Sequence, residues 1–455
     1  MLEELVSIII LIIITVLLCF ISKNIFNHEM PGRGSKNCVI GQIFPFGRLR
    51  INNDNKITNV TFLNKNFLNL YIFFNKVYDD NNNNNNSLDL LCFLHIFKLI
   101  YNGVAGKTKI KLDFETDLKK IITGLPKSMY MRTAMFIRRG FKFNKKYWTK
   151  FAKSNLLTYI PKGQSKINKI NEIINIKFPD WPNKEKDKFI THLLNDNTLL
   201  YIKNQSYFNG HWKQKFEPKY TKDGPFYIGD DKTVIIPMMT GIETEKLLTY
   251  QRQNLLFVSM PYKENGYSML IIMPEKPCNK KDLLDICINN LSADDITEFY
   301  NGKGKLVKYK KKIMPKFEFK TTWILNNSDN AVNNYNDTIN NYAPFMKIIL
   351  GNDINLQNIS ENIDENKSIH IESSSQISND EKGTSVISET IMYASDSSYH
   401  HPPPPPPPLP ILNIDKGFIW LIVKKINSND IKNNDDDYDN NNNNYLICNI
   451  GMFVG

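Results

Sequence analysis

The amino-acid sequence predicts an α+β protein whose second half is dominated by strands. Three observations support this fold class. Apolar residues recur at helical spacing near the start of the folded part, β-rich runs follow one another later, and an Asn-Gly turn joins two of those runs. With 455 residues, 42% of them apolar, the chain can bury a large core.

Three helices are predicted from periodicity and composition. The first has one apolar face, formed by Phe67, Leu70, Tyr71 and Phe74. The second is too apolar on all sides for a surface helix and is predicted to be buried, and the third is basic and amphipathic. In chain order, these helices cover Phe62–Val77, Leu88–Ile100 and Lys145–Ser154.

The predicted strands are short runs rich in β-branched and aromatic residues. Leu255–Pro261 and Tyr267–Met273 are joined by a turn that contains Asn265 and Gly266, which is the strongest short signal for a β-hairpin. The other predicted strands are Arg132–Ile137, Thr198–Phe208, Thr233–Met239, Phe418–Lys424 and Tyr445–Val454.

The N-terminal segment predicts contact with a membrane through residues 5–21, an apolar run within a hydrophobic segment 1–22. An uncleaved signal anchor and a cleaved signal peptide both fit it. The location is predicted as secreted or membrane-anchored, extracellular or in the endomembrane lumen. A cytosolic orientation stays open, because the basic residues follow the run. Residues 23–56 read as a linker, and 57–455 as the folded domain.

Three inserts of low complexity interrupt the folded domain, at 79–87, 402–408 and 429–444. The run Pro402–Pro408 predicts a stiff polyproline helix of roughly 20 Å. It can act as a spacer or as a docking site for a proline-binding module, and the sequence leaves both open.

The sequence contains none of the common motifs that are typical of an enzyme active site. There is no G-x-S-x-G elbow, no H-E-x-x-H and no Cys/His cluster with metal spacing, so neither catalysis nor a metal or other cofactor is predicted. NGVAGKTK imitates a phosphate loop, but Tyr101 stands where its first glycine is needed. The net charge of +11 suggests a candidate polyanion site at Lys305–Lys316, with a solvated strand face as the alternative.

The run NQSYFNGHWKQKF at 204–216 resembles a signature block of the serpin family. Further blocks recur in the family's order, and the match extends from about Thr61 to Val454. The resemblance implies three β-sheets, eight to nine helices and an exposed reactive loop over about 381–412. The further blocks are PFY, IPMM, MPYKENGYSMLIIMP, MPKFEF, GFIWLIV and LICNIGMFV.

DEKGTS at 380–385 looks like the hinge of that loop, which a cut frees to enter a sheet as an added strand. Counting along the loop as in the family places the scissile bond between Ser397 and Ser398. The hinge residues implied by the resemblance are Glu381, Lys382, Gly383, Thr384, Ser385 and Val386.

Insertion as a strand requires every second residue to fit beneath the sheet. The inward set passes this test, because all its members are uncharged: Thr384, Val386, Ser388, Thr390, Met392 and Ala394. The outward set contains Ser385, Ile387, Glu389 and Ile391.

The resemblance implies an inhibitor of serine proteases, with cysteine proteases as a second target class, that traps its target as a covalent complex. Residues 386–389 replace the run of alanines that inhibitory members usually carry, and residues 373–379 are unusually polar. A non-inhibitory serpin that acts as a chaperone, carrier or partner-binding protein is therefore the alternative.

Overall fold

In the computed structural model, the described residues all belong to the second of two units, 1–47 and 48–455. They are 60–77, 85–103, 129–140, 144–152, 156–162, 166–179, 181, 198, 200–229, 232–242, 245–326, 370–391, 411–426 and 444–455. The predicted span 5–21, the scissile bond and the proline run lie outside them. In the part that is described, no helix has the length and apolar character to cross a bilayer.

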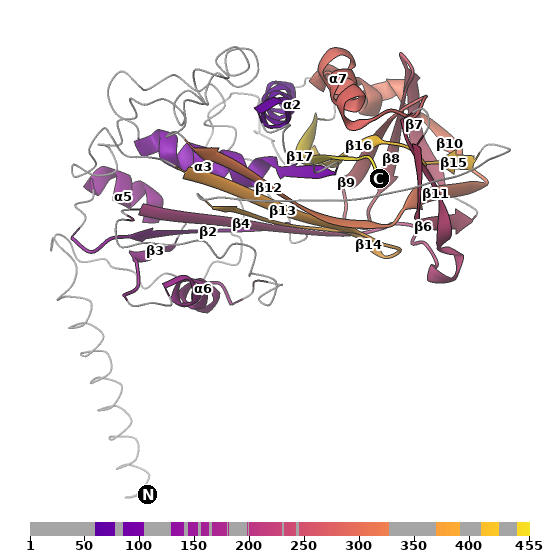
Figure 1. The fold of residues 1–455 in the computed structure, drawn as a ribbon. Coiled ribbons are helices and arrows are strands. Elements are labelled where there is room, and N and C mark those ends of the chain that lie inside the picture. Colours follow the sequence, from indigo (N-terminus) through magenta and orange to yellow (C-terminus); the bar gives the residue numbers. More distant parts are fainter. Residues whose placement is uncertain are drawn as a thin grey trace, which may run out of the picture. The chain divides into compact units, whose positions relative to one another are not determined.

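The described residues form three β-sheets, as the resemblance implies. One sheet has six strands in the order β12-β13-β14-β4-β2-β3 (Figure 1). Its strands are β12 (Phe317–Asn326), β13 (His370–Asn379), β14 (Gly383–Ile391), β4 (Leu200–His211), β2 (Met129–Ile137) and β3 (Leu156–Tyr159).

A seven-stranded sheet has the order β1-β17-β16-β9-β8-β7-β10, and a four-stranded one has the order β15-β11-β6-β5. The seven strands are β1 (Asn86–Asp89), β17 (Asn444–Phe453), β16 (Phe418–Ile426), β9 (Tyr267–Pro274), β8 (Leu255–Pro261), β7 (Lys246–Arg252) and β10 (Lys305–Lys308). The four are β15 (Ile411–Asn413), β11 (Lys311–Pro315), β6 (Lys232–Ile242) and β5 (Lys222–Ile228).

Six α-helices lie within the described residues, and the eight to nine that the resemblance implies stay a prediction. They are α2 (Val60–Val77), α3 (Leu90–Gly103), α5 (Lys145–Ala152), α6 (Lys166–Lys177), α7 (Lys280–Asn290) and α8 (Ala293–Glu298). Two further short helical turns are Pro218–Tyr220 and Phe299–Lys303. Periodicity predicted α2, α3 and α5, whereas α6, α7 and α8 were not predicted.

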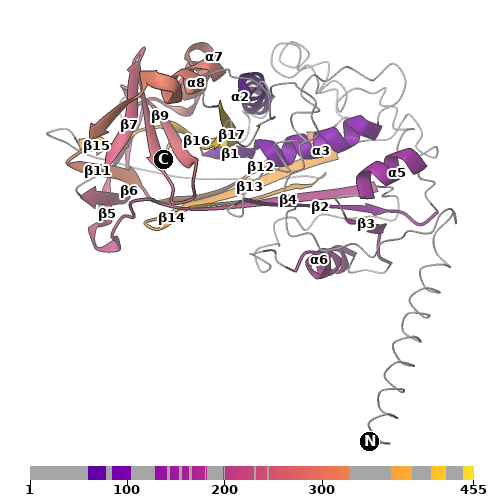
Figure 2. The ribbon, with the colours of Figure 1, turned by 180° about the vertical axis from the view of Figure 1, so that it is seen from behind.

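The six-stranded sheet is covered on both faces, with α3 on one side and α6 on the other (Figures 1 and 2). Alternation along β2 explains how. Ala134 and Phe136 pack with Ile170 and Ile174 of α6 in a small separate core. Met135, between them, belongs to the main core, which runs on through the seven-stranded sheet.

The predicted hairpin is confirmed, because β8 and β9 pair antiparallel and Gly266 has a φ of 79° in the turn. The predicted insert 79–87 is wrong at its end. Asn86 and Ser87 belong to β1, which pairs with β17, and the Asn86 amide donates to the Asn75 side chain at 2.8 Å. Pairing with a neighbouring strand and buried hydrogen bonds order these two polar residues.

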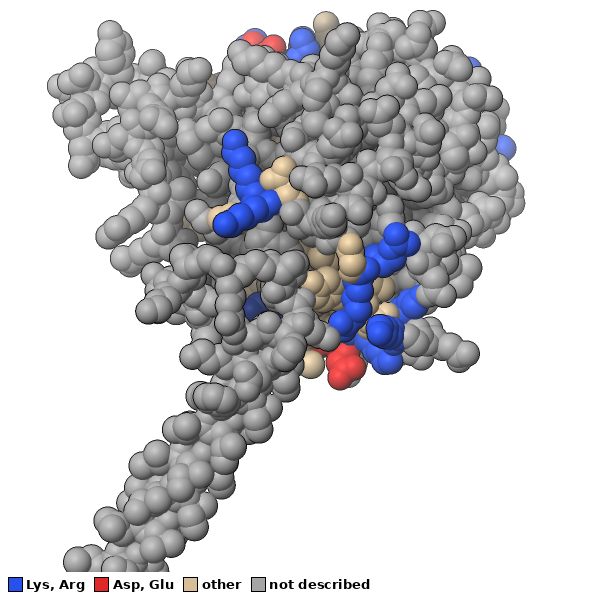
Figure 3. Space-filling model, turned by 90° about the vertical axis from the view of Figure 1, so that its left-hand side faces the viewer, with Lys and Arg blue, Asp and Glu red and all other residues tan. Residues whose placement is uncertain are grey.

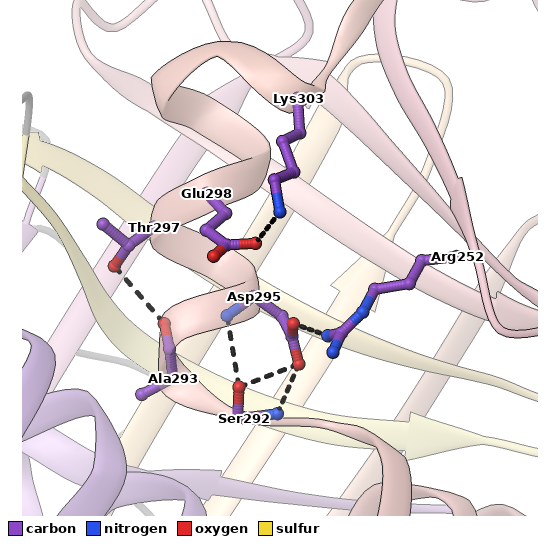
Figure 4. A network of polar contacts seen from close by, with 7 residues as sticks. All are labelled: Arg252, Ser292, Ala293, Asp295, Thr297, Glu298 and Lys303. Carbon is purple, nitrogen blue, oxygen red and sulfur yellow. Dashed lines mark hydrogen bonds and ion pairs between the residues drawn. The ribbon is translucent and has the colours of Figure 1, made fainter.

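A polar network fixes α8 against the hairpin of β7 and β8 (Figure 4). Ser292 caps α8 and forms a capping box with Asp295, in which each side chain bonds the other residue's backbone amide. The guanidinium of Arg252, at the end of β7, pairs with the same Asp295 carboxylate. Glu298 and Lys303 form a second, exposed pair at 2.6 Å.

Candidate functional site

The predicted hinge segment lies inside the six-stranded sheet as strand β14. It runs antiparallel to β13 from Thr384 to Ile391 and antiparallel to β4 from Gly383 to Ile391. The expectation of a loop exposed from about 381 onward is therefore corrected for this part, because its backbone groups pair on both sides. Residues 392–410, which include the predicted scissile bond Ser397–Ser398, lie outside the described residues.

The side chains of β14 follow the predicted alternation over its first half. Thr384 and Val386 are each 1% exposed and Ser388 is fully buried, as predicted for the inward set, while Ser385 is half-buried. Ile387 was predicted to face outward, yet it is also buried at 5% exposure. The segment thus fits the sheet with no described charge on its inner face.

The turn from β13 into β14 is built by Asp380. Its carboxylate accepts hydrogen bonds from the backbone amides of Lys382 at 2.8 Å and Gly383 at 3.1 Å. A side chain at Gly383 would bring its Cβ to 2.0 Å from the Gly210 carbonyl oxygen on β4. Only glycine therefore allows β14 to approach β4 this closely at its start.

The signature block holds this turn through Trp212, which follows β4. The indole nitrogen donates to the Asp380 carbonyl at 3.0 Å, and the Trp212 backbone amide donates to the Lys382 carbonyl at 2.9 Å. The ring stacks on Tyr262, with centroids 4.7 Å apart. Phe216 adds a backbone hydrogen bond to the Glu381 carbonyl at 3.0 Å.

Glu381 is the buried charged residue of the hinge, at 7% exposure, whereas Lys382 is exposed. Its carboxylate pairs with Lys316 at 2.9 Å and accepts from the Thr221 hydroxyl at 2.8 Å. Burial by itself would raise the pKa of Glu381, but these hydrogen bonds and the Lys316 charge outweigh it and lower that pKa. The ion pair therefore ties the hinge to the segment between β11 and β12.

The polar character of β13 has a structural reason. Ser375 accepts a hydrogen bond from the Ser388 hydroxyl at 3.1 Å, and Asn379 accepts one from Thr384 at 3.0 Å. Asn379 in turn donates to the Pro315 carbonyl at 3.0 Å. The polar side chains of β13 thus match polar side chains on the strand that lies beside it.

Asp89 lies beneath β14 and caps helix α3. One carboxylate oxygen accepts from the Cys92 backbone amide at 2.8 Å, and the other accepts from the Ser206 hydroxyl. Ser388 and Asn449 also favour the ionised form, more weakly. Burial is the larger effect and raises the pKa of this fully buried carboxyl.

Sequence reasoning missed the role of Asp89 and read the polar β13 as a departure from the family pattern. A signal for Asp89 was present, since it is a carboxylate in the first turn of the predicted helix Leu88–Ile100, where Asp is a common cap, and the observed helix α3 begins just after it, at Leu90. The side-chain partners of Asp89 come from distant strands, and no local pattern identifies them. Among the residues that the structure describes, no group of His, Cys, Asp and Glu could hold a metal ion.

The family model described as Serpin (serine protease inhibitor) matches residues 95–431, which is more than half of the chain. Glia-derived nexin of Rattus norvegicus is 28% identical over 234 residues, covering 48% of this chain and 53% of that protein. The chain spans between 20% and 59% of the length of curated relatives such as this one, and so less than two thirds of each.

Two solved structures share the fold over nearly their whole length. The cleaved form of Serpin 42Da has a TM-score of 0.62 and 13% identity, covering 88% of this chain and 99% of its own. Tengpin, a thermophilic serpin in the latent state, has a TM-score of 0.63 and 17% identity, with the same two coverages. At these identities the likeness shows the fold alone.

Proposed function

The chain belongs to the serpin family, and from this premise we propose that it inhibits serine proteases by inserting its reactive loop into the six-stranded sheet. The observation that carries the proposal is strand β14. Residues 383–391 pair with both β13 and β4, and their described inner side chains are buried without a charge. The segment is therefore compatible in shape and polarity with the gap it fills.

In the proposed mechanism, the target serine hydroxyl attacks the carbonyl carbon of Ser397. An ester forms between the two proteins, the peptide bond to Ser398 breaks, and Ser398 receives a proton on its new amino terminus. The free end then enters the sheet from the hinge at Gly383 and carries the acylated protease with it. Added backbone pairing and burial drive this movement.

The spacing between β14 and β15 also permits insertion in an uncut chain. Residues 392–410 number 19 and can extend for roughly 60 Å, whereas the nine residues of β14 cover about 30 Å. Strand β15 stays paired with β11, with Lys311 opposite Ile411, while β14 lies in the six-stranded sheet. The segment is therefore long enough to return to β15 without pulling it from its sheet.

Two arginine variants test insertion directly. Val386→Arg places a charge on the buried face, and Ser385→Arg, its matched control, places one on the half-buried face. The full chain and both variants are incubated with a panel of serine and cysteine proteases and resolved on denaturing gels. We expect a covalent complex for the wild type and for Ser385→Arg, and simple cleavage for Val386→Arg.

Melting after cleavage separates insertion from inhibition. Cleaved wild type should melt well above cleaved Val386→Arg, whether or not the uncut protein already holds β14 in the sheet. Equal melting of the two cleaved proteins would contradict insertion. Cleavage of the wild type by the whole panel with no complex, but with a stabilised product, would favour the non-inhibitory alternative. Mass spectrometry of the released fragment locates the cut relative to Ser397.

A further inference from the structure

Two positively charged side chains are buried on the face of the six-stranded sheet that α6 covers. Arg132 on β2 is 4% exposed, and Lys203 on β4 is 2% exposed. Figure 3 views the molecule from the side that lies on the left in Figure 1, and the Lys and Arg side chains that project from the surface there are screened by water. Arg132 and Lys203 are shielded from water, so the protein has to compensate their charge.

Arg132 is held in place by two amide side chains and an aromatic ring. Its Nε donates to the Gln205 side chain on β4 at 2.8 Å, and an Nη donates to the Asn175 side chain on α6 at 3.1 Å. The guanidinium also lies over the Trp181 ring, 4.1 Å from its centroid. These contacts fix the position of the guanidinium, but these three partners carry no charge.

Lys203 shares a row of the sheet with a buried carboxylate. Ile391 of β14 pairs with Lys203 on one side and with Glu372 of β13 on the other, and Glu372 is 3% exposed. The Lys203 ammonium donates to the Asn171 side chain on α6 at 3.0 Å. The inserted strand therefore holds a buried cation and a buried carboxylate two strand spacings apart, which is about 10 Å.

Residue 389 enters the same face of the sheet with the inserted strand. Ser388 faces the core, so alternation places position 389 on the opposite face, to which Arg132 and Gln205 belong. Glu389 pairs with Gln205 on β4, and Gln205 pairs with Arg132 on β2. Glu389 and Arg132 thus share one row across three strands, and the row of Lys203 lies two residues further along.

We propose that Glu389 is a positioning residue for the insertion described under the proposed function, on which this inference rests. Its negative charge compensates Arg132 and Lys203 once β14 is in the sheet. Because the strand enters from the hinge, this compensation is gained only after Thr384 to Ser388 have entered, and it favours the later part of insertion. It also fixes the register, because a shift by two residues would move the charge to another row.

The sign of the effect of Glu389→Gln tests this assignment. A carboxylate that entered the sheet without compensation would oppose insertion, because leaving water costs free energy, and its removal would stabilise the inserted form. The full chain, Glu389→Gln and a control, Glu318→Gln, are cleaved in the reactive loop and unfolded in urea. Glu318 is an exposed carboxylate on β12, so the control makes the same change of charge outside the buried face.

We expect the unfolding equilibrium constant of cleaved Glu389→Gln to be about tenfold larger than that of the cleaved wild type at the same urea concentration. Cleaved Glu318→Gln should stay near the wild type. The difference should persist at high salt, since buried charges are screened less than exposed ones. A cleaved Glu389→Gln as stable as the wild type or more stable, or a difference that disappears at high salt, would overturn the proposal.

A double-mutant cycle identifies the groups that Glu389 compensates. Glu389→Gln is combined with Arg132→Met and, separately, with Lys203→Met, which supplies the cycle if the first background does not fold. The effect of Glu389→Gln should shrink several-fold in these backgrounds, because the charge then has less to compensate. A role in packing alone would give the same effect in every background, and that result would contradict the assignment.

The failure of this inference and the failure of the proposed function give different results. Equal melting of cleaved wild type and cleaved Val386→Arg would overturn both, since β14 would not insert. A cleaved wild type that melts above cleaved Val386→Arg, together with a cleaved Glu389→Gln as stable as Glu318→Gln, would overturn the role of Glu389 and leave insertion standing.

Discussion

The seven-stranded and six-stranded sheets both bury side chains, but they differ in the kind of side chain that they bury. In the seven-stranded sheet, every residue of β9 is buried and only Ser268 among them is polar, and the apolar residues Phe418 to Val423 of β16 are buried as well. In the six-stranded sheet, β13 buries Ser373, Ser374 and Ser375 in a row. The first sheet is packed mainly through apolar side chains, whereas β13 and β14 of the second sheet also bury polar side chains that hydrogen-bond across the two strands.

This difference fits the proposed movement of β14. Separating two apolar strands exposes surface at about 25 cal/mol per Å², whereas a hydroxyl that loses its protein partner can bond to water instead. A sheet that must open to admit a strand can therefore carry polar side chains where its strands separate. In this sheet β14 lies between β13 and β4, and we call the boundary of β14 with these two strands the parting line. The pairs Ser375–Ser388 and Asn379–Thr384 lie on that line.

The largest expected effect contrasts the two sheets directly. Leu421→Ala in β16 removes a fully buried side chain from the apolar sheet and should lower the free energy of unfolding by about 3 kcal/mol. Ser375→Ala in β13 should lower it by about 1 kcal/mol, because only a hydrogen bond is lost. Guanidinium unfolding of both variants measures the difference, and equal losses would break the comparison.

The next effect concerns the closest contact of the parting line. Gly383→Ala should destabilise the protein with β14 inserted by about 2 kcal/mol, because the new Cβ meets the Gly210 carbonyl oxygen and forces β14 away from β4. The exposed neighbour supplies the control, since Lys382→Ala leaves this contact intact. Unfolding of the loop-cleaved forms is the measurement, and a Gly383→Ala protein as stable as the control would show that β14 does not pair there.

The extent to which sequence predicts this molecule differs between the two sheets. Strands such as 267–273 and 418–424 were predicted because apolar runs must be buried wherever they lie. β13 appeared abnormal, because the hydroxyls that Ser375 and Asn379 bond are supplied by a strand beyond the turn. The inner face of β14 could be predicted from alternation, whereas Ile387 could not, since coverage of the outer face depends on tertiary packing.

The positions of charged groups were the least predictable. Lys312 and Lys316 are close in a basic stretch, but one is buried over an aromatic ring and the other pairs with the hinge. Asp89 acquires its surroundings from β4, β14 and β17, which lie more than a hundred residues away. The sequence therefore shows how many charged residues a stretch contains, whereas the fold determines which of them are buried and which partners they have.

A smaller effect, on the pH dependence of stability, is expected at Asp89, a buried polar residue of the six-stranded sheet's surroundings. Its pKa in the folded protein is raised above 3.8, so the folded state holds this proton more tightly than the unfolded state does. Its stabilising contribution is full below that value and is lost as the pH rises through the raised pKa. The nearby Cys448 thiol stays neutral in this range, because burial raises its pKa.

Asp89→Asn should remove that part of the slope of unfolding free energy against pH, at a cost of no more than about 1 kcal/mol, because the amide oxygen can still accept from Cys92. Unfolding measured from pH 4 upward in both proteins provides the test. Parallel curves for wild type and variant would show that Asp89 does not titrate differently in the folded state.

The smallest expected effect is at Glu381, and it has the opposite sign. Its pKa is lowered in the folded protein, so its contribution is present above the ordinary value of 4.5 and is lost as the pH falls through the lowered pKa. Glu381→Gln should cost about 0.5–1 kcal/mol at neutral pH, since the partner Lys316 is 45% exposed and its charge is screened. The control is Glu318→Gln, an exposed carboxylate on β12. In acid, wild type and Glu381→Gln should converge, whereas the advantage of wild type over Asp89→Asn should be greatest in acid and should decline as the pH rises. If both variants changed the profile in the same direction, the hinge ion pair and the buried carboxyl would not be the opposing groups that the structure describes.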